Sequence, residues 1–138
     1  MPGSFLDTNV LVYLASGDES KSGRVEALLA GECTLSVQVL NEFANVARRK
    51  MSFGWGEVRD FLAIVRALTV IVPIGIETHN DGLRLSERYR FSIYDAMIVS
   101  AALLAECDTL WSEDMQDGLV VEDRLTIRNP FATGAGPQ

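Results

Sequence analysis

Residues 3–15 read Gly-Ser-Phe-Leu-Asp-Thr-Asn-Val-Leu-Val-Tyr-Leu-Ala, and this stretch contains the change of local structure that defines the fold. The segment from Gly3 to Leu6 is short and does not alternate strictly with charged residues, which is typical of a buried strand that ends at Asp7. From Thr8 to Ala15 the apolar residues continue over a length that suits a helix. The stretch therefore predicts a strand followed directly by a helix.

The same alternation continues along the chain. Further strands are expected at residues 33–36, 69–73 and 109–111, with weaker candidates at 119–121 and 125–127. Further helices are expected at residues 20–30, 37–50, 57–68, 77–89 and 92–106. Short apolar strands separated by helices indicate an α/β domain, in which a parallel sheet is covered on both faces.

The composition fits one folded domain. The 138 residues are 48% hydrophobic and 22% charged, which is typical of a globular chain. We expect a single domain over residues 1–130 and a tail over residues 131–138, which is rich in Gly and Pro. No apolar run approaches the roughly 20 residues that cross a bilayer, and the N-terminus lacks a basic leader, so we expect a cytoplasmic protein with no membrane partner.

Several kinds of site are disfavoured by the residue content. Cys33 and Cys107 are far apart, are expected to be reduced, and have no partner at zinc-ligand spacing. His79 is the only histidine, so a Cys–His nucleophile is also disfavoured, and His79 is expected to be structural or exposed. The net charge of −7 does not favour a nucleic-acid-binding surface, because affinity for phosphates comes from Lys and Arg.

Four carboxylates have positions that indicate a shared site. Asp7 and Asp114 follow expected strands. Glu42 lies at the margin of an apolar helix stripe, and Asp95 shares the inward face of its helix with Ile98. In parallel sheets, ligands gather beyond the carboxyl ends of the strands, where the strand order reverses. These four acids are therefore the candidate functional residues.

Each acid taken alone also has a structural interpretation. Asp7 could cap the following helix, and Asp95 lies in a sequence that resembles a capping box, although that motif prefers Glu or Gln. Glu42 could reach solvent from the edge of its helix. Asp114 and Asp117 are ordinary turn residues.

Together, the four acids favour a divalent cation. Several carboxylates in one half-buried crevice raise each other's pKa, and desolvation adds to the cost of keeping them ionised. Mg²⁺ and Mn²⁺ prefer oxygen ligands and reverse that balance. Such a site can polarise a phosphate and supply hydroxide at neutral pH, and it needs no histidine, cysteine or lysine.

Four motifs occur in order along the chain. They are Phe5-Leu-Asp-Thr-Asn-Val-Leu-Val-Tyr13, Val39-Leu-Asn-Glu-Phe43, Tyr94-Asp-Ala-Met-Ile-Val-Ser-Ala-Ala102, and Ser112-Glu-Asp-Met115 followed by Gly118. Together they resemble the PIN-domain ribonucleases, and most closely the VapC-type toxins of bacterial and archaeal toxin–antitoxin pairs. The resemblance implies three α/β/α layers around a central, mostly parallel sheet of four to five strands.

The resemblance also implies a metal-dependent endoribonuclease that is the toxin of a type II toxin–antitoxin pair. Asp7, Glu42, Asp95 and Asp114 match the four acidic positions of the family. The implied ligands of one or two Mg²⁺ or Mn²⁺ ions are Asp7, Asp95 and Asp114, while Glu42 would position water or contact the metal indirectly. The implied supporting residues are Thr8, Asn9, Ser112 and Asp117.

Three partners are implied by the resemblance. They are a structured or looped RNA, which is cut to leave a 5′-phosphate and a 3′-hydroxyl, a cognate VapB-like antitoxin, and a second copy of the chain in a homodimer. RNA contacts could come from two basic clusters, although a solvated helix end explains both. The clusters are residues 48–50 and the set Arg84, Arg88 and Arg90. The aromatic residues Phe53, Trp55 and Phe61 either fill the core or line a groove for an antitoxin helix.

Two other functions remain open at this point. A haloacid-dehalogenase-like phosphatase carries an Asp-x-Asp motif after its first strand, but here Asn9 takes the place of the second acid. Neither Lys21 nor Lys50 follows a late strand, where such an enzyme holds its phosphate. A non-catalytic domain with an acidic pocket, such as a receiver domain, leaves Glu42 unexplained. Metal-dependent RNA cleavage separates these functions from the ribonuclease.

Overall fold

The computed structural model describes residues 3–132, which contain a six-stranded sheet in the order β3-β2-β1-β4-β6-β5. The strands are β1 (Ser4–Leu6), β2 (Cys33–Ser36), β3 (Val70–Val72), β4 (Thr109–Trp111), β5 (Val120–Val121) and β6 (Leu125–Arg128). The neighbours from β3 to β6 pair in parallel, and β5 pairs antiparallel with β6. The mostly parallel sheet is therefore confirmed. It has six strands rather than four to five because both weak candidates near the end of the chain pair with it.

The helices of the described residues begin and end within two residues of the predicted positions. They are α1 (Thr8–Ala15), α2 (Glu19–Leu29), α3 (Val37–Lys50), α4 (Trp55–Leu68), α5 (Ile76–Tyr89) and α6 (Ile93–Leu104). Helix α4 begins earlier than expected because the Glu57 carboxylate accepts the backbone N–H of Gly54 (2.8 Å), which makes Glu57 the third residue of the helix and not the first.

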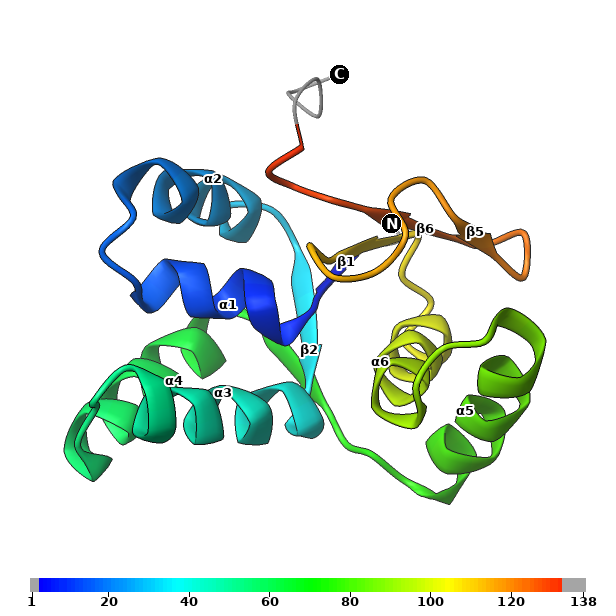
Figure 1. Ribbon diagram of the computed structural model, residues 1–138, viewed down its shortest axis with the longest axis horizontal. Coiled ribbons are helices and arrows are strands. Elements are labelled where there is room, and N and C mark those ends of the chain that lie inside the picture. Colours follow the sequence, from blue (N-terminus) through cyan, green and yellow to red (C-terminus); the bar gives the residue numbers. More distant parts are fainter. Residues whose placement is uncertain (1–2, 133–138) are drawn as a thin grey trace.

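The connections between strands place the helices in two layers. Figure 1 shows α1 to α4 on one side of β1 and β2, and α5 and α6 on the other side. The chain moves outward from β1 through β2 to β3, then returns past β1 to β4. Because crossovers between parallel strands are right-handed, outward and returning connections cover opposite faces. The strand order thus reverses between β1 and β4, and this is where a ligand site is expected.

The core holds the central strands and the inner faces of the helices. Phe5, Leu6 and Leu110 are fully buried in β1 and β4. Between α5 and α6 the backbones approach closely at Gly82, where a Cβ atom would lie 2.7 Å from the Met97 sulfur. The sheet and its two helix layers therefore form one hydrophobic core.

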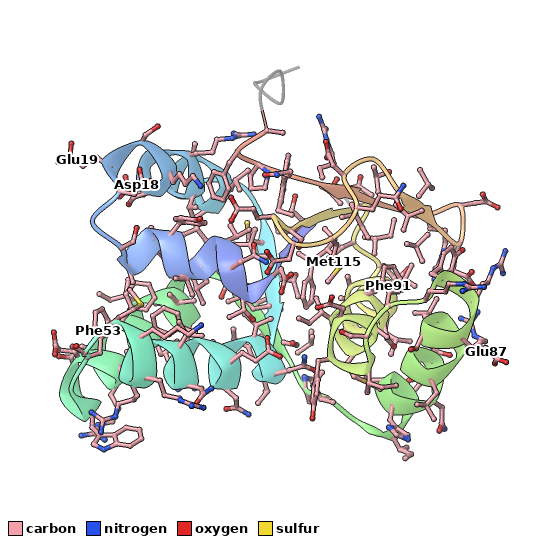
Figure 2. The ribbon with its side chains drawn as sticks, in the orientation of Figure 1. Asp18, Glu19, Phe53, Glu87, Phe91 and Met115 are labelled. Carbon is pink, nitrogen blue, oxygen red and sulfur yellow. The ribbon has the colours of Figure 1, made fainter. Side chains whose placement is uncertain are left out.

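The aromatic residues near the start of α4 divide between the core and the surface. Phe61 stacks on the buried Phe43 (ring centroids 4.6 Å apart), and Phe53 meets the same ring edge-on at 6.4 Å. Figure 2 shows Phe53 beside α3 and α4. Trp55 is 58% exposed, and the Arg48 guanidinium lies 4.4 Å from the centre of its ring. Phe53 and Phe61 are thus partly buried and packed against the core, whereas Trp55 is exposed at the surface.

Other expectations concern single residues and the chain end. Cys33 and Cys107 are buried free thiols, and His79 is exposed near the start of α5. No helix within residues 3–132 is long and apolar enough to span a membrane. Of the expected tail, residues 133–138 lie outside the described residues, whereas the Phe131 ring packs edge-on against Tyr13 (4.9 Å). The boundary after residue 130 stays a prediction.

Candidate active site

Asp7 lies at the carboxyl end of β1, beside β4. Its backbone N–H donates to the carbonyl of Trp111 (3.0 Å), which fixes the end of β1 against β4. The buried carboxylate caps α1 by accepting the backbone N–H of Thr8 (2.7 Å). Its second oxygen accepts from the Ser112 hydroxyl (2.8 Å) and from the Asn9 side-chain amide (3.0 Å). The capping interpretation is therefore correct, but it accounts for one carboxylate oxygen and leaves the other for the site.

Glu42 lies on the face of α3 that meets α1. The Thr8 hydroxyl donates to one carboxylate oxygen (2.6 Å), and the Gln38 amide donates to the other (2.9 Å). The same amide donates to the carbonyl of Tyr94 (3.0 Å), which links α3 to the start of α6. Glu42 is held in one orientation by a donor on each oxygen. Because each carboxylate oxygen has two lone pairs, it can still accept from a water molecule.

Asp114 lies in the loop after β4 and is joined to Asp7 through a shared neighbour. The Asn9 amide nitrogen donates to Asp114 (3.1 Å) as well as to Asp7, while its oxygen accepts the backbone N–H of Glu113 (3.0 Å). The Ser112 hydroxyl accepts the backbone N–H groups of Asp114 (3.2 Å) and Met115 (3.3 Å). Asn9 and Ser112 therefore shape the loop, in which Met115 is labelled in Figure 2, and fix the two acids relative to each other.

Asp95 lies in the first turn of α6, and its charge interacts with those of the other acids. Its pKa is raised, first by burial and then by the neighbouring charges of Asp114 and Glu42. Burial raises the pKa of Asp7 to about 6; the Ser112 hydrogen bond opposes this shift, while the charges of Asp95 and Glu42 add to it. The acids therefore form one electrostatic cluster, although they come from four separate parts of the sequence.

A cleft of about 410 Å³ contains the acid cluster. Its lining residues are Asp7, Thr8, Asn9, Val12, Tyr13, Glu42, Val46, Lys50, Asp95, Glu113 and Asp114. All four predicted acids are in this set, as are the supporting residues Thr8 and Asn9. Ser112 is buried beneath Asp7. Asp117 is not among the described residues that line the cleft, and its carboxylate instead accepts the backbone N–H of Asn129 (2.8 Å), which joins the loop before β5 to the residue that follows β6.

The donor set of the cleft suits a hard divalent cation, but its oxygens are not arranged as a ready-made ion cage. Within residues 3–132, no three His, Cys, Asp or Glu side chains are grouped closely enough to hold a metal ion together. Neutral donors lie among the acids, since the Asn9 amide bridges Asp7 and Asp114 and the Thr8 hydroxyl bonds to Glu42. Charge interactions reach farther than direct coordination, so the acids raise each other's pKa at separations that are too large for shared ligation. The raised pKa values show negative charge that a cation would stabilise.

The structure adds a network at the rim of the cleft that the sequence did not predict. The Tyr13 hydroxyl donates to Glu113 (3.0 Å), and the Lys21 ammonium lies 3.1 Å from both the Tyr13 hydroxyl and Glu113. Tyr13 is four residues after Asn9 and Gln38 is four before Glu42. Tyr13 and Gln38, which both contact acids at the cleft, could therefore have been found from their helical spacing to the predicted residues Asn9 and Glu42.

Three of the six residues in the two basic clusters, Arg48, Arg84 and Arg88, are engaged in contacts within the protein. Arg84 and Arg88 form ion pairs with Glu122 (2.8 and 3.2 Å). Arg48 donates to the carbonyl of Phe53 (2.9 Å) and lies over Trp55.

The sequence of residues 4–116 matches the PIN domain family. The chain belongs to the PIN domain family. The predicted family is therefore confirmed. The matched region extends from β1 to the loop after β4 and contains all four acids.

Solved structures have the same fold as this PIN domain. A toxin–antitoxin complex from Klebsiella pneumoniae superposes with a TM-score of 0.72 at 19% identity, covering 95% of this chain and 100% of the other. A VapC toxin of Mycobacterium tuberculosis, described as cleaving the sarcin-ricin loop, has a TM-score of 0.65 at 17% identity and covers 81% and 90%. A VapBC complex of Rickettsia felis, bound to a DNA fragment from its promoter, has a TM-score of 0.65 at 22% identity and covers 91% and 97%. No curated protein matches the sequence significantly.

Proposed function

We propose that this PIN domain is a metal-dependent endoribonuclease and acts in the cytoplasm as the toxin of a type II toxin–antitoxin pair. The observation that carries the proposal is the cleft, in which acids from four remote segments lie together where β1 and β4 meet. Membership of the PIN domain family supports it. The solved toxin that is described as cleaving the sarcin-ricin loop supports a structured or looped RNA as the substrate.

Asp7, Asp95 and Asp114 would hold one or two Mg²⁺ or Mn²⁺ ions, directly or through water molecules, because the three carboxylates are not grouped closely enough to ligate one ion together. All three offer carboxylate oxygens to the same cleft, and the pKa values of Asp7 and Asp95 are raised because negative charges are buried near one another. The chemistry that a divalent cation supplies at such a site is polarisation of the phosphodiester and activation of water at neutral pH.

The remaining polar residues orient the acids. Ser112 donates to Asp7 and so favours its ionised form, which is the form that binds a cation. Thr8 and Gln38 fix the Glu42 carboxylate, which can then accept a hydrogen bond from a water molecule. This hydrogen bond would direct a lone pair of the water oxygen toward the phosphorus. Asn9 sets the separation of Asp7 and Asp114.

A VapB-like antitoxin and a second copy of the chain are the proposed protein partners. The support is the set of solved structures with this fold, which includes toxin–antitoxin complexes. The proposed domain covers residues 1–130. Coexpression with a small DNA-binding protein encoded beside this chain would test both partners, because a stable complex of defined stoichiometry is expected.

The deciding experiment is RNA-end sequencing in cells after brief induction of the chain. New 5′-phosphate ends at a defined site are expected with the unmodified protein and are absent with Asp7→Ala. In a purified assay with Mn²⁺, Asp95→Asn is expected to lose cleavage, whereas Asp60→Asn, which removes an exposed acid of α4, keeps it. Circular dichroism confirms that both variants fold. Equal cleavage by Asp95→Asn and the unmodified protein would refute the assignment.

A further inference from the structure

The acidic cleft continues along the seam between α1 and α3 to a basic end. On α3, the lining residues Glu42, Val46 and Lys50 follow one another at intervals of four, which places them on one face of the helix. Val12 and Tyr13 of α1 line the opposite wall. The cleft is therefore polarised, with carboxylates at the end that contains Glu42, an apolar middle section and an ammonium group at the end that contains Lys50.

Lys50 is the cation of this cleft that the protein itself leaves available. The chain has two lysines, and the other, Lys21, is paired with Glu113 at 3.1 Å. Within residues 3–132, Lys50 forms no ion pair, and its side chain is exposed. Arg48, two residues earlier, is turned to Phe53 and Trp55. The basic helix end of α3 is thus divided, with Arg48 serving the fold and Lys50 facing the cleft.

The distance between the two ends of the cleft matches a short piece of nucleic-acid strand. Eight residues separate Glu42 from Lys50, which is about 12 Å along the helix axis. A stacked strand advances about 3.4 Å per nucleotide, so the same distance corresponds to roughly three nucleotides. The apolar section formed by Val12 and Val46 suits sugars and base faces, which need no charged partner there. The Tyr13 ring borders this section and is already in contact with the Lys21 ammonium (4.2 Å) and the Phe131 ring (4.9 Å).

We propose that Lys50 binds a backbone phosphate of a single-stranded RNA segment, about three nucleotides from the phosphate held at the acids. The inference rests on the proposed ribonuclease function. A strand whose scissile phosphate lies at the carboxylates has its neighbouring phosphates along the cleft. Lys50 supplies a positive charge there that, unlike the charge of Lys21, is not already paired with a carboxylate. An acidic antitoxin segment is the competing occupant of this position.

RNA binding at several salt concentrations tests the proposal. The background is Asp95→Asn, which is not expected to cut, and the probes are a labelled oligouridylate and a labelled RNA stem-loop in the presence of Mg²⁺. Each phosphate contact contributes about 0.7 to the slope of log K against log salt for single strands. Lys50→Gln is therefore expected to make this negative slope shallower by about 0.7. The ratio of the unmodified protein's affinity to that of Lys50→Gln should then fall about 2.6-fold when the salt concentration rises fourfold.

Two further variants sharpen the result. Lys50→Arg is expected to keep the slope. Arg49→Gln removes a charge from the same helix end and, since Arg49 does not line the cleft, is expected to change the slope less. With the active protein, Lys50→Gln should raise KM and leave kcat nearly unchanged, because this contact is remote from the reacting phosphate.

The outcomes separate the two levels of the argument. If the unmodified protein cuts RNA but Lys50→Gln and Arg49→Gln have equal slopes, the proposal for Lys50 is wrong and the ribonuclease function stands. Loss of antitoxin binding by Lys50→Gln with unchanged RNA binding also overturns it, in favour of the competing occupant. If the unmodified protein neither cuts nor binds RNA, both the function and the inference fall.

Discussion

Replacing Asp7 by Asn should remove a pH-dependent loss of stability from the metal-free protein. The Asp7 carboxyl has its pKa raised from 3.8 to about 6 because it is buried beside other acids. The folded state therefore holds this proton more tightly than the unfolded chain does. Its contribution to stability is fully present below pH 3.8 and is lost as the pH rises through about 6. At 1.36 kcal/mol per pKa unit, the full loss is about 3 kcal/mol.

The assay is urea denaturation at fixed protein concentration and a series of pH values, with a chelator present. We expect the free energy of unfolding of Asp7→Asn, relative to the unmodified protein, to rise by about 2.4 kcal/mol between pH 4 and pH 7, because part of the full loss has already occurred at pH 4. The hydrogen bonds that Asn cannot accept from Ser112 and Asn9 add an offset, but an offset that does not vary with pH leaves this rise unchanged. Adding Mn²⁺ should stabilise the unmodified protein more than the variant, because the variant lacks a charged ligand.

If the difference in free energy of unfolding between Asp7→Asn and the unmodified protein stays constant from pH 4 to pH 7, the argument that burial raises the pKa of Asp7 is refuted. A difference that falls with pH would show that the carboxyl is stabilised as an anion even without a cation.

Three other substitutions test separate contacts. Thr8→Val removes the 2.6 Å hydrogen bond to the Glu42 carboxylate and should lower the kcat of RNA cleavage about tenfold, with little change in fold. An unchanged kcat would contradict the role of Thr8 in orienting Glu42. Ser112→Ala should lower the free energy of unfolding, measured by urea denaturation, by about 1–3 kcal/mol, because a buried hydroxyl with three hydrogen-bond partners is lost. It should also move the acid limb of the pH–activity profile upward, since the donor that lowers the Asp7 pKa is gone; a downward move would contradict this. Gly82→Ala should cost about 1–3 kcal/mol by pressing a methyl group against Met97, and unaltered stability would show that this side chain moves freely.

The features that were predictable from the sequence are those that are set locally. The strand and helix of residues 3–15 follow from a short apolar run and one capping acid, and the structure has both at the predicted positions. The four acids could be found because Asp7 and Asp114 follow strands, where the ligand sites of parallel sheets lie, and because Glu42 and Asp95 lie on or beside inward helix faces. The structure brings all four into one cleft.

The features that were missed depend on contacts between remote residues. Glu113 meets Lys21 across 92 positions of sequence, and no local pattern encodes such a pairing. The strand signal at residues 119–121 was weak because β5 has only two residues, so the sheet was expected to be smaller. Asp117 and Arg48 have residue types that suit a site, but backbone groups at Asn129 and Phe53 take up their hydrogen bonds.

The position of β1 in the sheet has a consequence for the order of events during protein synthesis. β1 is made first, yet it lies between β2 and β4, so one of its edges stays open until most of the chain has been translated. The last acid of the cleft, Asp114, follows β4 directly. A ribosome that makes this chain therefore meets no complete acid cluster until residues beyond position 114 have left the exit tunnel.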